Sequence, residues 1–195
     1  MDHTPRRGLV ALLAALATAG ALLSFPATAA ADDRNCSGRL GGVRIDGNVI
    51  VPAGAKCTLS GTRVDGNVIV GRGAVLHAYG VRVEGNVQGE GAASVNVRSS
   101  SFVDGDVQVE QGGAATVADT TVNGNIQYEA NRGGVRAGRN RVGGDVQVFS
   151  NRGGAWINDN RVDGNLQCKG NSPAPVGSGN VVAGNAEDQC RRLVK

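Results

Sequence analysis

The residues best suited to chemistry lie in a short repeated unit, and Val64-Asp65-Gly66-Asn67-Val68 is its clearest copy. The carboxylate of this unit could bind a cation or transfer a proton, and its amide could bind a polar ligand. The unit recurs around eight glycines at intervals of 19 or 20 residues: Gly47, Gly66, Gly85, Gly105, Gly124, Gly144, Gly164 and Gly184. A period of this length is typical of a solenoid, so each polar residue belongs to a column of equivalent residues.

Two charged columns precede the glycines. The residue directly before the glycine is usually acidic, as at Asp46, Asp65, Glu84, Asp104 and Asp163, and the residue two positions earlier is usually arginine, as at Arg44, Arg63, Arg82, Arg141 and Arg161. Residues two apart on a strand share one side, so we expect exposed charges that compensate each other. The alternatives are a row of Ca²⁺ ligands or a catalytic groove. The arginines oppose a metal site, and the GGxGxDxUx pattern of calcium-binding β-rolls is missing.

A third polar column follows the glycine by three residues and consists of five glutamines: Gln88, Gln108, Gln127, Gln147 and Gln167. One interpretation is a flat binding face for sugars, with Phe149, Tyr128 or Trp156 as stacking area. The other, which we favour, is hydrogen bonding between neighbouring coils of the solenoid. The column is therefore a candidate binding face without an assigned ligand.

Catalytic groupings are missing from the sequence of residues 32–195. This part of the chain has one histidine, His77, and no Ser/His/Asp, Cys/His or phosphate-loop arrangement. We therefore predict a protein without catalytic residues or a cofactor. The alternative is a carbohydrate-binding or polysaccharide-cleaving β-helix. Polysaccharide lyases and hydrolases of this architecture usually build a cleft from long loop insertions, for which coils of such regular length leave no room.

Apolar residues predict the elements that position these columns. The residues two before, two after and four after each glycine are mostly β-branched, as at Val64, Val68 and Val70. Their shared parity favours strands with one buried face. A second apolar column lies about seven residues before the glycine: Leu59, Ala78, Val97, Val117, Ala137, Ile157 and Val176. Each unit thus carries at least two short strands.

The fold class that follows is all-β: a single-domain, right-handed parallel β-helix of about eight coils over residues 32–195. The chain contains 31 glycines and only 3% aromatic residues, which suits a solenoid with a narrow interior. Its formal charge of +3 gives no basis for nucleic-acid binding, which needs a clustered basic face.

The glycine and the residue after it have structural explanations. The glycine either adopts a positive φ or leaves room for close backbone approach where the coil bends. The next residue is always Asn or Asp: Asn48, Asn67, Asn86, Asp106, Asn125, Asp145, Asn165 and Asn185. We expect their side chains to stack and bond between coils, rather than to form a row of ligand contacts.

Residues 1–31 have the composition of a cleaved secretory signal peptide. Arg6 and Arg7 precede an apolar stretch from Leu9 to Leu23 that is too short to span a bilayer, and Ala27-Thr28-Ala29 fits a cleavage site. The remaining sequence has no second apolar span. We therefore expect a secreted, extracellular protein with no transmembrane segment after removal of the signal.

Four cysteines, Cys36, Cys57, Cys168 and Cys190, allow three pairings. The first two lie at nearly equivalent places in neighbouring repeats, and so do the last two. This register favours Cys36–Cys57 and Cys168–Cys190, which would join the first two and the last two coils. An oxidising compartment would preserve both bonds.

The repeat resembles two known groups. Its VDGNV-type units, leader and terminal cysteine pairs are similar to those of exported β-helix proteins of actinobacteria, over residues 35–190. This resemblance implies fold and export but no activity. A looser resemblance to bactofilin-like polymer-forming repeats implies self-assembly, although the leader and the stapled ends depart from that pattern. The expected role is a non-enzymatic structural or binding module, and the expected partners are an envelope polysaccharide or a second copy of the chain.

Overall fold

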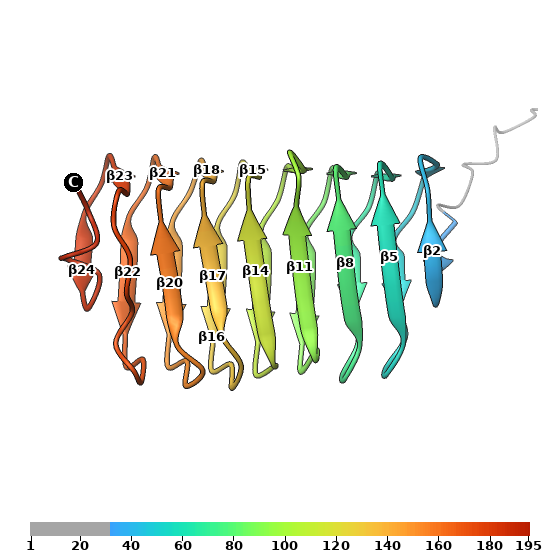
Figure 1. The fold of residues 1–195 in the computed structure, drawn as a ribbon. Helices are drawn as coiled ribbons and strands as arrows, with labels where there is room; N and C mark the ends of the chain where they lie inside the picture. The colour runs from blue at the N-terminus through green and yellow to red at the C-terminus, as the bar shows by residue number, and fades with distance from the viewer. Residues whose placement is uncertain (1–31) are drawn as a thin grey trace, which may run out of the picture. The chain divides into compact units, whose positions relative to one another are not determined.

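The computed structural model describes residues 32–195, and the predicted signal peptide of residues 1–31 lies outside the described residues. Residues 32–195 form a parallel β-helix in which successive coils stack side by side, as the strands from β2 to β20 show in Figure 1. The predicted fold class of about eight all-β coils is confirmed. Each full coil has three strands, because a bend at the repeat glycine separates a two-residue strand that the apolar pattern did not resolve.

Three parallel sheets make up the walls of the solenoid. Sheet A contains β1 (Arg34–Asn35), β4 (Val49–Val51), β7 (Val68–Val70), β10 (Val87–Glu90), β13 (Val107–Glu110), β16 (Ile126–Glu129), β19 (Val146–Phe149), β22 (Leu166–Lys169) and β24 (Ala186–Asp188). Sheet B contains β2 (Gly38–Leu40), β5 (Lys56–Ser60), β8 (Val75–Tyr79), β11 (Ser94–Arg98), β14 (Ala114–Ala118), β17 (Val135–Gly138) and β20 (Ala155–Asn158). Sheet C contains β3 (Arg44–Ile45), β6 (Arg63–Val64), β9 (Arg82–Val83), β12 (Phe102–Val103), β15 (Thr121–Val122), β18 (Arg141–Val142), β21 (Arg161–Val162) and β23 (Val181–Val182).

The core is a set of stacked aliphatic columns. Val64 of sheet C and Val68 of sheet A are both buried, and each pairs in register with the equivalent valine of the next coil. The second apolar column lies on sheet B, where Leu59 and Ala78 are register partners and are equally buried. Valine fits these positions because a β-branched side chain packs well on a pleated surface that is covered on one side.

The repeat glycines are required because the coils approach each other closely there, and not because the backbone adopts a positive φ. Their φ angles lie outside the left-handed region, which is occupied instead by turn residues such as Asp119 and Arg139. A Cβ added at Gly66 would lie 2.6 Å from Oδ1 of Asn48 and 2.8 Å from the carbonyl oxygen of Gly47. Any side chain at this column would therefore push two coils apart.

The Asn/Asp column forms a continuous outer ladder beside these glycines. The backbone N–H of Asn67 donates to Oδ1 of Asn48 at 2.7 Å, and its side-chain amide donates to the same oxygen at 3.1 Å. The backbone bond recurs along the column up to Asn185, and Asp33 supplies the accepting oxygen for Asn48 in the first coil. Each side chain thus replaces a backbone acceptor at the bend.

Two inner asparagine ladders were not recognised from the sequence. They consist of Asn131, Asn151 and Asn171 at the turn from sheet A to sheet B, and of Asn140, Asn160 and Asn180 at the turn from sheet B to sheet C. Oδ1 of Asn151 accepts the backbone N–H and the side-chain amide of Asn131, each at 3.0 Å, and its own amide donates to the carbonyl oxygen of Tyr128 at 2.9 Å. In residues 32–195, every buried side-chain nitrogen and oxygen has a partner.

Disulfides join the terminal coils in the pairing that the repeat register indicated. Cys36 and Cys57 are bonded with their Cα atoms 5.6 Å apart, and Cys168 and Cys190 with theirs 5.2 Å apart. The last seven residues then fold over the end of the solenoid, where the carbonyl oxygen of Leu193 accepts the side-chain amide of Asn180 at 2.7 Å. The final strands therefore have both a covalent and a hydrogen-bonded cap.

Replacing Asn151 by alanine is expected to lower the free energy of unfolding by about 3 kcal/mol, because the Asn131 N–H and the Tyr128 carbonyl lose their partners in a buried turn. Asn185→Ala is the matched control, since Asn185 ends the outer ladder and is exposed; its cost should stay below about 0.5 kcal/mol. Urea unfolding followed by circular dichroism measures both. Equal midpoints for the two variants would contradict a stabilising role of the inner ladders.

Removing the C-terminal disulfide as Cys168→Ala/Cys190→Ala is expected to loosen the last coils and leave the middle intact. The bond closes a sequence separation of 22 residues, and a loop of this length is worth about 3 kcal/mol. Hydrogen exchange should accelerate in β22 and β24 while β10 and β13 keep their protection, because each coil contacts only its neighbours. Uniform acceleration along the chain would show that the bond stabilises the whole solenoid.

Candidate functional site

The five glutamines of the predicted binding face lie on the outer side of sheet A, one on each strand from β10 to β22. Gln88 donates to Gln108 at 3.3 Å, and Gln108 donates to Gln127 at 3.0 Å. After an interruption, Gln147 donates to Gln167, which in turn donates to Glu187. The side chains are half-buried. The structure therefore brings all five into one line, and hydrogen bonding between coils holds them in place.

A column of carboxylates runs beside this line. Glu90, Glu110 and Glu129 are register partners on β10, β13 and β16, and the next two coils continue the column with Phe149 and Lys169. Three carboxylates thus lie on neighbouring strands at the turn into sheet B. Together with the glutamines they form a surface rich in hydrogen-bond acceptors.

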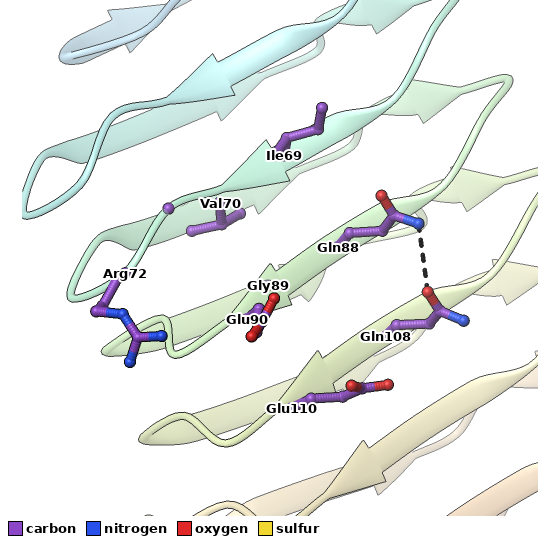
Figure 2. A pocket seen from close by; sticks show the side chains of 9 residues that line it. Ile69, Val70, Arg72, Gln88, Gly89, Glu90, Gln108 and Glu110 are labelled. Carbon is purple, nitrogen blue, oxygen red and sulfur yellow. Dashed lines mark hydrogen bonds between the residues drawn. The ribbon is translucent and has the colours of Figure 1, made fainter.

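A hollow of about 530 Å³ lies at one end of these two columns, and we call it the sheet A hollow. Figure 2 shows its lining side chains, with Gln88 and Gln108 joined by their hydrogen bond on neighbouring strands. It lies where the strands of sheet A lengthen, since β7 ends at Val70 whereas β10 continues to Glu90. Ile69, which is 39% exposed, adds an apolar side chain to the polar lining.

The aromatic residues do not gather on this face. Tyr128 is fully buried, so its expected use as stacking area is wrong. It occupies the column four residues after the glycine, which points into the core, and its hydroxyl donates to the carbonyl oxygen of Arg136 at 2.8 Å. Phe149 lies on sheet A at the end of the carboxylate column, whereas Trp156 belongs to β20 of sheet B.

The charged columns on sheet C form exposed ion pairs, as the compensating pattern indicated. Arg44 contacts Asp65 of the next coil at 2.6 Å, and Arg82 contacts Glu84 of its own coil at 2.7 Å. The hydrogen bond to Asp65 raises the pKa of the Arg44 guanidinium. Exposed pairs of this kind contribute little to stability, so their role is to balance charge on the outer side of sheet C.

His77 lies on the outer side of sheet B, away from the glutamine line. Its ring stacks on that of Tyr79 with centroids 6.2 Å apart, and its Nδ1 lies 3.4 Å from the side-chain nitrogen of Asn96. Within residues 32–195, no group of three or more His, Cys, Asp or Glu side chains is arranged to hold a metal ion. The same residues contain no helix long and apolar enough to cross a membrane.

Two features, one in the interior and one on the surface, were not predicted from the sequence. The inner asparagine ladders had a usable signal, because their members recur at intervals of 20 residues, but only over three coils each. The second feature is a hollow on sheet B beside Trp156, which depends on two small residues in adjacent coils. No family model, curated protein or solved structure matches this chain.

The buried tyrosine gives a pH dependence with a definite sign. Burial raises the pKa of the Tyr128 hydroxyl above its ordinary value. Below about pH 10 the hydroxyl is neutral in both states, and above it only the unfolded chain ionises, so stability should fall by about 1.4 kcal/mol per pH unit. Urea midpoints between about pH 8 and pH 11 measure this loss.

Tyr128→Phe should remove that alkaline loss while costing about 1 kcal/mol at neutral pH, because the Arg136 carbonyl loses its donor. Tyr79→Phe is the matched control, since the Tyr79 ring is 38% exposed; this variant should keep the full slope. If the loss of stability with rising pH persists in Tyr128→Phe and disappears in Tyr79→Phe, this loss must be assigned to Tyr79 instead of Tyr128.

Proposed function

We propose that the protein is an exported, non-enzymatic β-solenoid that binds polysaccharide of the cell envelope or surroundings along the outer face of sheet A. The observation that carries this proposal is the fixed line of Gln88, Gln108 and Gln127 beside the carboxylate column. Hydroxyl groups of a sugar both donate and accept, so amides and carboxylates held in rows match them. A repeating ligand also suits a repeating surface.

The cysteines and the leader support the proposed compartment. Two disulfides are typical of an oxidising environment. The leader-like composition of residues 1–31 supports export by the secretory route, and the capped coils support a protein that withstands conditions outside the cell.

The proposal assigns no catalysis to the carboxylates of the sheet A hollow. Glu90 and Glu110 both line the sheet A hollow, and paired carboxylates are the groups that cleave glycosidic bonds. Such catalysis requires two environments that push the pKa values of the pair apart. Glu90 and Glu110 are instead register partners in one column on neighbouring strands, an arrangement that favours a row of binding groups over two carboxylates with separate catalytic roles.

A glycan array with a reducing-sugar assay tests the proposal. We expect retention of at least one polysaccharide without release of reducing ends. Gln88→Ala/Gln108→Ala should weaken that binding about tenfold, because two hydrogen-bonding side chains are lost. Gln167→Ala is the control on the same line but away from the hollow, and it should retain most of the affinity. Retention of no glycan would refute the proposal, and release of reducing ends would make the protein an enzyme.

A further inference from the structure

A second hollow, of about 410 Å³, opens on the outer side of sheet B over β11, β14, β17 and β20. We call it the arginine hollow, and its polar or aromatic lining consists of Arg98, Thr116, Arg136, Arg139, Trp156 and Asn158. Its size falls within the range of about 300–1,000 Å³ that is usual for small-ligand sites. It lies on a different sheet from the glutamine line.

Two small residues create the arginine hollow. One outward column of sheet B runs through Arg98, Ala118, Gly138 and Asn158, and the last three are register partners on consecutive strands. The same column carries Tyr79 in an earlier coil. The gap between Arg98 and Asn158 therefore arises where two consecutive strands carry small residues in this column.

Two of the three guanidinium groups around the gap lack an acidic partner. Arg139 donates to both carboxylate oxygens of Asp119, at 2.6 and 2.8 Å, and is thereby neutralised. Arg98 donates to Oδ1 of Asn96 at 3.2 Å, and among residues 32–195 neither Arg98 nor Arg136 has a carboxylate within salt-bridge distance. The hollow thus presents positive charge that the protein itself does not compensate.

Trp156 fixes the position of one of these charges. The guanidinium carbon of Arg136 lies 4.3 Å from the centroid of the Trp156 ring. A guanidinium stacked on an aromatic ring keeps the N–H donors at its edge, where they can form two parallel bonds to a carboxylate. The half-buried indole thereby holds the Arg136 guanidinium at the hollow. Asn158 uses its oxygen to accept from the backbone of Ser178, which leaves its amide to donate outward.

We propose that the arginine hollow is a binding site for a saccharide that carries carboxylate groups. The two uncompensated guanidiniums bind the carboxylates, Trp156 holds one of these guanidiniums in position, and Thr116 and Asn158 bond the hydroxyls of the sugar. A neutral sugar would leave both arginines unpaired. Nucleic acid fits less well, because it needs a longer track of basic residues or several aromatic platforms, and the arginine hollow has two unpaired arginines and one ring.

Calorimetry with alginate oligomers, whose sugars each carry a carboxylate, tests this site. We expect alginate to bind, with dextran and polyphosphate binding at least tenfold more weakly. Arg98→Gln/Arg136→Gln should weaken alginate binding at least tenfold. Ala118→Tyr should do the same without altering charge, because the tyrosine fills the gap in a column that already accommodates Tyr79. Gln88→Ala/Gln108→Ala should bind alginate at the arginine hollow normally, so failure of this site and of the sheet A face are distinguishable.

Arg63→Gln/Arg141→Gln is the matched control, since it removes two exposed arginines from sheet C and changes the net charge equally. If both double variants lose the same alginate affinity, the effect is general electrostatic attraction, and the proposed site is overturned. Unchanged binding by Ala118→Tyr, or tighter binding of polyphosphate than of alginate, would also overturn it. A further outcome would also overturn the saccharide site: alginate does not bind, and sedimentation shows that the chain self-associates. If Arg98→Gln/Arg136→Gln abolishes this self-association, the arginine hollow binds a second copy of the chain instead.

Discussion

Parallel backbone hydrogen bonding between successive coils fixes the position of every other group in this molecule. Because the coils stay in register, valine lies over valine, glutamine over glutamine and asparagine over asparagine. The bends are the weak points of such stacking, since there the backbone turns out of the sheets. Asparagine and glycine solve this problem together: the amide supplies the missing hydrogen bonds, and the glycine allows the coils to approach closely enough to form them.

Because the coils stay in register, differences in sequence between the repeats change the shape and charge of the surface. Sheet C carries arginine and carboxylate columns whose charges compensate each other. Sheet A gains a hollow where its strands lengthen by one residue, and sheet B gains one where Ala118 and Gly138 interrupt a column of larger side chains. In a solenoid without loop insertions, such local departures from the repeat are the places where a ligand can bind in place of water.

The interior was easier to predict from the sequence than the surface. Val64, Val68 and the four cysteines follow from the period alone, because a buried column tolerates few residue types. Tyr128 stands in the column four residues after the glycine, whose parity predicts the core, so only its use as stacking area was wrong. The arginine hollow could not be found this way. Coils contain 19 or 20 residues, and a 20-residue coil has one additional residue in one of its turns. The turn in which this residue lies decides whether Arg98 and Ala118 share a column.

The asparagine ladders have opposite polarity. In the outer ladder each side-chain oxygen accepts from the following coil, and in the inner ladders each accepts from the preceding one. Asp33 completes the first type at the N-terminal end, whereas Gln189 and the Leu193 carbonyl complete the second at the C-terminal end. The two terminal coils are therefore not interchangeable, but any central coil can be duplicated or deleted as a whole without breaking a ladder. The length of the solenoid is thus free to vary in evolution by unequal exchange of single coils, while its ends remain fixed.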